Sequence, residues 1–206
     1  MRFTASVISY LLHPLFIPLY VGCFLMFVHP GYFVGYNTQQ KVMLLIRIAY
    51  VMVFFPVVTV LLLKAIGFIE SVMLHTQKDR IIPYIACGIY FFWAYLVFRN
   101  QPSIPGVLTA FTFAVFLSSS AALLANIYFK ISMHAIGVGG LFGFFLLMLF
   151  NDTSFGITLP FMTVVFISGL VLTARLIVSD HIARDVYYGF LLGMVCQLAG
   201  ALFISI

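Results

Sequence analysis

The sequence contains very little charge. Lys, Arg, Asp and Glu together make up 7% of its 206 residues, and only five residues are acidic. A soluble domain carries about 25% charged residues, so a hydrophobic content of 64% and a mean hydropathy of +1.19 exclude that class. We therefore expect an integral membrane protein.

Cysteine is also scarce, and basic residues do not form a patch. Cys23, Cys87 and Cys196 lie inside apolar runs without CxxC spacing, which predicts packing residues rather than disulfides or a thiolate metal site. The net charge of +5 comes from Lys and Arg residues scattered singly at the ends of apolar runs. Nucleic acid is not an expected partner, because proteins that bind it gather such residues on one surface.

Long apolar runs occupy most of the chain. A transmembrane helix needs about 20 apolar residues, and polar and turn residues separate seven candidate spans. The runs cover residues 4–28, 43–69, 83–98, 104–128, 131–150, 155–178 and 185–206. We predict an all-α, polytopic transmembrane helical bundle with six to seven spans, forming a single domain over residues 1–206. The first run is too long for a signal peptide, so we expect it to remain as a span.

Alternate crossings divide the polar segments between two membrane edges. Face A comprises the N-terminus and residues 70–80, 129–132 and 179–184. Face B comprises residues 29–41, 99–104 and 151–154 and the C-terminus. The candidate functional side chains gather at face A: Lys78, Arg80, Ser132, His134, Arg175, His181 and Asp185. Face B offers only Asp152 and scattered basic residues, so the polar chemistry is expected on one side.

The stretch ARLIVSDHIARDVYYG, residues 174–189, concentrates five ionisable side chains. His181 and Asp185 are spaced i, i+4, so one helical turn brings the carboxylate to one imidazole nitrogen. Such pairing leaves the other nitrogen as a nucleophile or base. Arg175 presents a planar fork of donors that suits phosphate. The His-x3-Asp pair alone is also typical of a surface hydrogen bond.

Two further segments contribute to face A. In KISMHAIG, Ser132 and His134 stand where a helix begins, and the unpaired N–H groups there favour an anion. In QKDRIIPY, Lys78 and Arg80 flank Asp79, a pattern that by itself also fits a solvated loop. Two histidines, one carboxylate and three cations together favour phosphoryl transfer through a histidine, because an excess of fixed cations suits an anionic substrate.

At these residues the sequence resembles the type 2 phosphatidic acid phosphatase superfamily of membrane lipid-phosphate phosphatases. The third motif of that family, Ser-Arg-x5-His-x3-Asp, is reproduced by Ala174, Arg175, His181 and Asp185, with alanine in place of serine. Residues 131–134 match the second motif, Pro-Ser-Gly-His, at its serine and histidine.

The first motif of the family, Lys-x6-Arg-Pro, is not present with that spacing. Lys78, Arg80 and Pro83 are the nearest candidates, and Lys64 competes for the position of the lysine. The resemblance extends over about residues 60–206.

The resemblance implies a metal-independent phosphatase that hydrolyses a lipid phosphate or a polyprenyl pyrophosphate through a phosphohistidine intermediate. His181 would be the nucleophile, Asp185 would orient it, and His134 would transfer protons. The implied phosphate ligands are Arg175, Lys78, Arg80 and Ser132. No cofactor is expected, and the implied partners are the lipid substrate and the bilayer. The implied location is the bacterial inner (cytoplasmic) membrane, as a multi-pass protein.

Two other functions fit the same residues. A phosphotransferase of the same fold would pass the phosphoryl group to another lipid. A non-catalytic lipid-binding or transport protein is favoured by Ala174 and by the missing first motif. The positive-inside rule places face A in the cytoplasm, whereas many bacterial relatives in the family place their site in the periplasm, so the orientation stays open.

Two further features bear on helix packing. Gly139 and Gly143, and Gly189 and Gly193, have the GxxxG spacing that lets membrane helices approach closely. We expect these faces to hold the two histidine motifs together. His13 lies outside the resemblance, and we expect it to form a helix–helix hydrogen bond within the membrane.

Overall fold

The computed structural model describes residues 2–152, 156–178 and 181–204. Seven segments within these ranges are helical, long enough and apolar enough to cross a membrane, and no strand occurs among the described residues. The predicted all-α polytopic bundle is confirmed, and the chain is an integral multi-pass membrane protein. The spans are Arg2–Val28, Thr38–Ala65, Gln77–Arg99, Gly106–Tyr128, Met133–Asn151, Thr158–Val178 and Ala183–Ile204.

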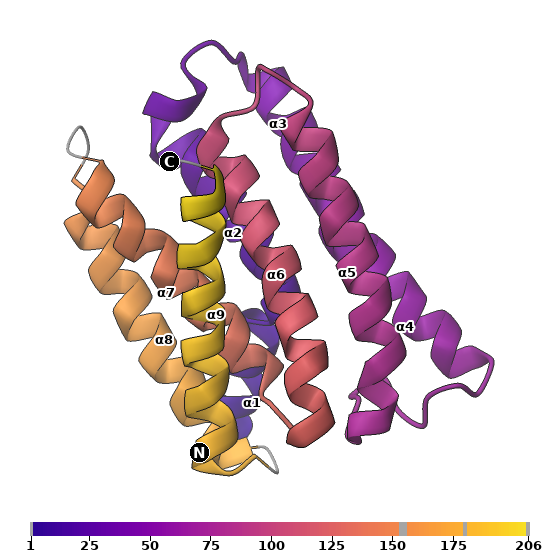
Figure 1. The fold of residues 1–206 in the computed structure, drawn as a ribbon. Coiled ribbons are helices and arrows are strands. Elements are labelled where there is room, and N and C mark those ends of the chain that lie inside the picture. The colour runs from indigo at the N-terminus through magenta and orange to yellow at the C-terminus, as the bar shows by residue number, and fades with distance from the viewer. Residues whose placement is uncertain (1, 153–155, 179–180, 205–206) are drawn as a thin grey trace.

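The helices run up and down between the two faces (Figure 1). The helices that build the site are α1 (Arg2–Leu11), α5 (Gln77–Arg99), α7 (Met133–Asn151), α8 (Thr158–Val178) and α9 (Ala183–Ile204), and α6 (Gly106–Tyr128) packs against α5 and α9. The lower end in Figure 1 gathers the starts of α1, α5, α7 and α9 with the end of α8. This end corresponds to face A.

Prolines interrupt the first span, and a π-helical turn divides the second. After α1, the first span continues as the short helices η1 (Pro14–Phe16), α2 (Ile17–Cys23) and η2 (Phe24–Val28). Pro14 and Pro18 lack an N–H and cannot continue a regular helix, so the chain bends between α1 and α2. The second span comprises α3 (Thr38–Ala49), a π-helical turn η4 (Tyr50–Phe54) and α4 (Phe55–Ala65). A short helix η3 (Pro30–Phe33) connects the two spans.

Side-chain caps fix where the helices at the site begin. The Thr76 hydroxyl accepts a hydrogen bond of 3.1 Å from the N–H of Asp79, so α5 starts at Gln77, before the apolar run that begins at residue 83. The Ser132 hydroxyl accepts one of 3.4 Å from the N–H of Ala135 and starts α7. Each cap pairs one of the N–H groups that a helix start leaves without an intrahelical partner.

Glycines allow α7 and α9 to pack backbone against backbone. A Cβ atom on Gly139 would lie 2.0 Å from the carbonyl oxygen of Phe190, and one on Gly193 would lie 2.0 Å from that of Ile136. A Cβ on Gly189 would lie 2.9 Å from the Ser132 carbonyl oxygen. The predicted role of the GxxxG faces is confirmed, because they allow the two histidine-bearing segments to pack in direct backbone contact.

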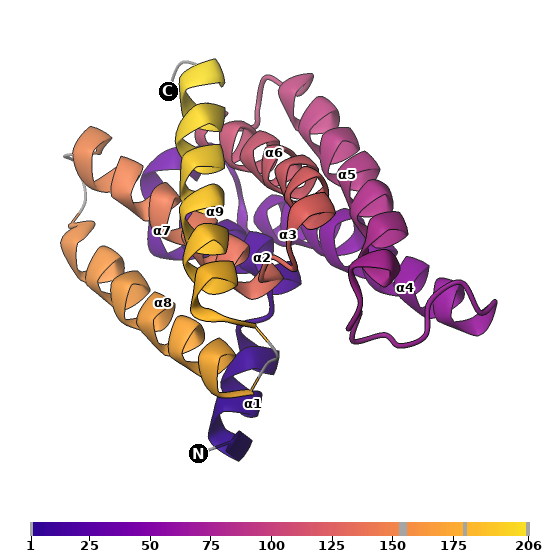
Figure 2. The ribbon, with the colours of Figure 1, turned by 60° about the horizontal axis from the view of Figure 1, so that its bottom comes forward.

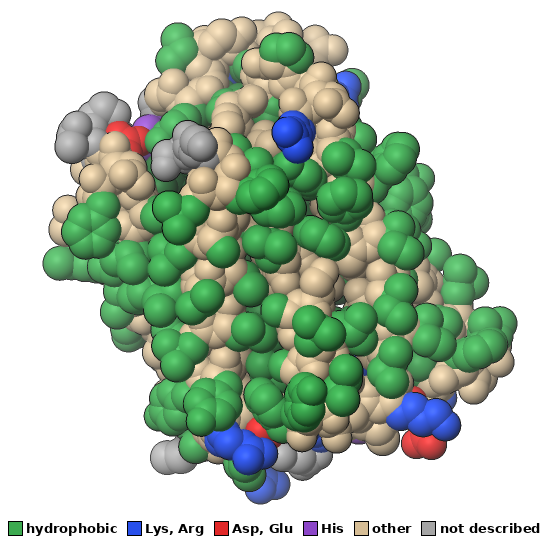
Figure 3. Space-filling view, in the orientation of Figure 1, with side chains coloured by type: hydrophobic (Ala, Val, Ile, Leu, Met, Phe, Trp, Pro, Cys, Tyr) green, Lys and Arg blue, Asp and Glu red, His purple; other side chains and the backbone are tan. Residues whose placement is uncertain are grey.

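The outer surface is apolar. Figure 3 shows hydrophobic side chains over most of one face of the molecule, with charged side chains at its upper and lower edges. Exposed residues such as Trp93, Phe166 and Leu202 belong to this surface. Seen after the turn in Figure 2, α1 and α8 lie at one side of the bundle and α4 lies at the opposite side. Such a belt suits contact with lipid chains.

Candidate functional site

The His181–Asp185 pair forms where the chain enters α9. His181 Nδ1 lies 3.6 Å from Asp185 Oδ2, and the two side chains are 4% and 7% exposed. This distance is longer than a hydrogen bond, so the carboxylate faces Nδ1 without a direct hydrogen bond to it. Arg184 Nε lies 3.9 Å from the other carboxylate oxygen. The contact at Nδ1 leaves Nε2 as the nitrogen that points away from the carboxylate.

The charges around His181 are mainly positive. Arg80, Arg175 and Lys130 act on its imidazole together with Asp185. Burial, reinforced by the three cations, lowers the pKa of His181 from 6.5 to about 4, and Asp185 opposes this shift. The ring is therefore neutral at pH 7 and carries a lone pair. The surrounding cations also favour an anionic ligand.

A backbone hydrogen bond joins the two predicted histidine motifs. The N–H of Ser132 donates to the carbonyl of Asp185 over 3.2 Å. The Ser132 side chain is fully buried and caps α7. Ser132 therefore begins α7 beside Asp185, and its hydroxyl is occupied with capping the first turn of that helix.

His134 lies in the first turn of α7 and contacts α1. Its Nε2 lies 3.0 Å from the backbone carbonyl oxygen of Ser9. Its ring packs edge to face on that of His13, with 5.0 Å between the centroids. Arg175 and His181 act electrostatically on the same imidazole. The sequence did not indicate that Ser9 and His13 belong to the site, because nothing in the pattern pairs the first span with α7.

Arg80 is a buried part of the site, whereas Lys78 is exposed. The Arg80 side chain donates from Nε to the Leu74 carbonyl over 2.9 Å and from Nη1 to the Ile131 carbonyl over 2.8 Å. Lys78 points outward from the first turn of α5. Lys64, the competing candidate, donates to the Glu70 carbonyl in the connection before α5. Of the three cations, Arg80 is the one brought to the histidines.

Arg175 lies in the last turn of α8, where its charge reaches several partners. Its positive charge interacts electrostatically with His13, His134 and His181, and also with Arg80. Helices from five parts of the chain, α1, α5, α7, α8 and α9, thus converge on one cluster. Among the described residues, no group of three or more His, Cys, Asp or Glu side chains is placed to hold a metal ion.

Face B contains a buried pair that the sequence did not predict. His29 Nε2 lies 2.9 Å from Asp152 Oδ2, with side chains 2% and 8% exposed. Burial, together with a hydrogen bond and the charge of Asp152, raises the pKa of Tyr32 to about 12. The pair ties the end of the first span to the residue that follows α7.

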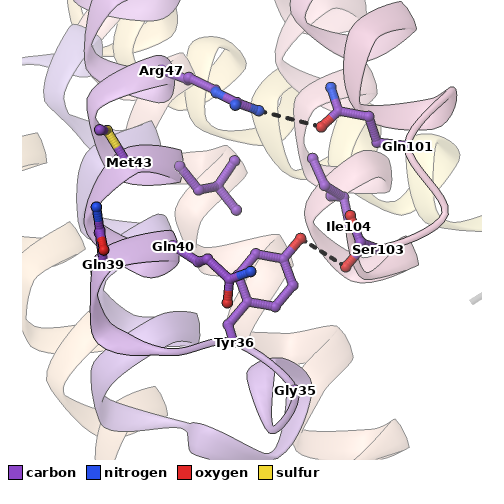
Figure 4. Close-up of a pocket in the computed structure, with 10 residues that line it drawn as sticks. Gly35, Tyr36, Gln39, Gln40, Met43, Arg47, Gln101, Ser103 and Ile104 are labelled. Carbon is purple, nitrogen blue, oxygen red and sulfur yellow. Dashed lines mark hydrogen bonds between the residues drawn. The ribbon is translucent and has the colours of Figure 1, made fainter.

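A cavity of about 510 Å³ also lies at face B, between the start of α3 and the connection that follows α5 (Figure 4). Arg47 Nη1 donates to Gln101 Oε1 over 3.4 Å, and the Tyr36 hydroxyl donates to the Ser103 carbonyl over 3.0 Å. Because this cavity opens at the opposite membrane edge, it is separate from the histidine cluster.

Comparison of the chain with protein-family models, curated proteins and solved structures finds no match. The site must therefore be judged by its own chemistry. It offers a neutral buried imidazole beside a carboxylate, a second imidazole fixed by a carbonyl, and two buried or half-buried guanidinium groups. These groups can supply a nucleophile, a proton carrier and positive charge for an anion.

Proposed function

We propose that the protein is a membrane phosphatase that hydrolyses a lipid phosphate or a polyprenyl pyrophosphate through a phosphohistidine. The observation that carries this proposal is the convergence of His181, Asp185 and His134 with two arginines at the ends of separate helices. The resemblance of residues 174–185 and 131–134 to the two histidine motifs of the lipid-phosphate phosphatases supports the same reaction.

In the first step, Nε2 of His181 attacks the phosphorus in line with the leaving oxygen. A P–N bond forms as the P–O bond breaks. His134 takes up a proton when the anionic phosphate lies beside it and gives that proton to the leaving oxygen. Asp185 stabilises the positive charge that develops on His181, since its carboxylate faces Nδ1.

In the second step, a water molecule attacks the phosphohistidine. His134, now neutral, takes a proton from that water, the P–N bond breaks, and inorganic phosphate leaves. Arg175 and Arg80 offset the charge on the equatorial oxygens. Arg80 acts mainly through its charge, because its Nε and Nη1 already bind backbone carbonyls.

The surroundings of the site suit a lipid. The cluster lies at the ends of the spans, which is the depth of a headgroup. An apolar hollow of about 300 Å³ lies between the end of α6 and the first half of α9, and Phe129, Ile131, Tyr188 and Leu192 line it. The carbonyl of Ile131 binds Arg80, so the hollow borders the site and suits an apolar chain.

The first experiment measures phosphate release from a panel of lipid phosphates and pyrophosphates by the detergent-purified protein. A His181→Ala variant is compared with His75→Ala, which replaces an exposed histidine at the same membrane edge. We expect release by the wild type and by His75→Ala, and none by His181→Ala. Vanadate, which mimics five-coordinate phosphorus, should inhibit the active proteins.

Two results would contradict the proposal. One is equal release by the wild type and by a folded His181→Ala variant. The other is no release from any lipid by folded wild-type protein, which would favour the phosphotransferase or the non-catalytic alternative. Adding an acceptor lipid then separates these two, because only a transferase would label the acceptor.

A further inference from the structure

His13 and His134 come from segments far apart in the chain and meet at face A. The centroids of their rings lie 5.0 Å apart, with an interplanar angle of 84°. His13 follows α1 and caps η1, because its Nδ1 accepts a hydrogen bond of 3.3 Å from the N–H of Leu15. The hydrogen bond to the Leu15 N–H therefore holds the His13 ring in place independently of its contact with His134.

The partners of the two rings assign their tautomers. A backbone N–H can only donate, so Nδ1 of His13 is the unprotonated nitrogen. A backbone carbonyl can only accept, so Nε2 of His134 carries the hydrogen that reaches the Ser9 oxygen over 3.0 Å. In the neutral His134 ring, Nδ1 is then the nitrogen with the lone pair.

We propose that His13 is a positioning residue for His134. The Ser9 carbonyl fixes the tautomer of His134, and the His13 ring fixes its plane, so that Nδ1 both gives and takes the proton. The proton transfer at Nδ1 of His134 rests on the proposed phosphatase function. The position of the ring itself does not depend on that function.

The other groups that act on His134 come from two further elements. Arg175 of α8 and His181, which precedes α9, both act on its imidazole. Neither of them accepts the Nε2 hydrogen, which the Ser9 carbonyl binds. The first span therefore supplies the contacts that set the orientation of His134, while α8 and the start of α9 supply charge.

Two substitutions separate the ring of His13 from its capping nitrogen. His13→Phe keeps a flat ring but loses the acceptor for the Leu15 N–H. His13→Asn keeps a side-chain acceptor suited to a helix cap but loses the ring. His75→Ala serves as the control. Histidine-selective ¹⁵N NMR in lipid nanodiscs reports the tautomer of His134, whose signals a His134→Gln variant identifies.

We expect a single Nε2–H tautomer for His134 in the wild type, in His75→Ala and in His13→Phe. His13→Asn should show both tautomers, because without the His13 ring His134 can turn away from the Ser9 carbonyl that fixes its tautomer. Its kcat on a lipid phosphate should fall roughly 10- to 100-fold with little change in KM. The proposal is overturned if His134 keeps one tautomer and kcat is unchanged in His13→Asn, or if His13→Phe behaves like His13→Asn. If the wild type hydrolyses no lipid, the proposed function fails, and the tautomers still decide the role of His13.

Discussion

The N–H of Ser132 and the carbonyl of Asp185 form a hydrogen bond of 3.2 Å. This bond joins the start of α7 to the start of α9 through the backbone alone. The side chain of Asp185 can therefore be changed while the bond that registers the two helices remains. This separation allows the chemistry of the carboxylate to be tested without dismantling the site.

Asp185→Asn should leave the fold intact and slow the reaction. An amide cannot stabilise an imidazolium as a carboxylate does, so we expect kcat to fall about 10²- to 10⁴-fold. Phosphate release and thermal unfolding in detergent measure the two effects. Glu70→Gln, at an exposed acidic residue, is the control. Activity within about twofold of the wild type would remove Asp185 from the mechanism.

The acid limb of activity should lie near pH 4. The pKa of His181, the proposed nucleophile, is lowered to about 4, chiefly by burial. Its imidazole therefore stays neutral well below pH 6.5 and becomes protonated only as the pH falls through about 4. The phosphohistidine formed in a single turnover, measured from pH 3.5 to 8, tests this prediction. An acid limb centred at pH 6.5 would show that His181 is not the titrating nucleophile.

Stability should change over a related pH range. The unfolded chain protonates His181 near pH 6.5, whereas the folded protein does so only near pH 4. Between these values the unfolded state binds more protons, so the contribution of His181 to stability falls as the pH drops from 6.5 to 4. Unfolding of the wild type and of His181→Gln, followed at pH 7 and pH 4.5, should show a smaller loss in the variant. An equal loss would contradict a neutral, buried His181.

Gly139→Ala should separate α7 from α9. The added methyl would lie 2.0 Å from the Phe190 carbonyl oxygen, so the backbones must move apart. We expect a loss of about 1–3 kcal/mol or more, together with reduced activity. Gly140→Ala is the matched control one residue along, where the nearest atom lies 3.8 Å away. Equal unfolding temperatures for the two variants would refute this contact.

Arg80 should matter more than Lys78. Arg80→Ala leaves the carbonyls of Leu74 and Ile131 without their guanidinium and removes a charge beside His181. We expect it to lower both stability and kcat, whereas Lys78→Ala, at an exposed position outside the histidine cluster, should have little effect. Kinetics and unfolding of both variants provide the measurement. If Lys78→Ala impairs activity as strongly as Arg80→Ala, the exposed lysine is the phosphate ligand.

The sequence predicted those features that depend on local spacing. Apolar length identified the spans, and the i, i+4 spacing placed Asp185 against His181. Small residues at GxxxG spacing identified the faces that join α7 to α9. Each of these signals lies within one continuous stretch of the sequence, so no knowledge of the tertiary fold was needed.

Contacts with backbone carbonyls could not be predicted in this way. Arg80 binds the carbonyl of Ile131, and His134 binds that of Ser9. Every residue type has a carbonyl, so such acceptors leave no mark in the sequence. Their use depends on how the helices pack, as does the pairing of His29 with Asp152.

The first span is bound to both ends of α7. Ser9 contacts His134 at one end, across 125 residues of sequence, and His29 pairs with Asp152 at the other. The ribosome synthesises the first span before α7. During insertion, His29 therefore has no Asp152 to pair with until α7 has been made. α7 therefore packs against a helix that entered the membrane four spans earlier. Substitutions at His29 should consequently appear as slow assembly and degradation of the nascent chain, even though this residue lies at the opposite membrane edge from the histidine cluster.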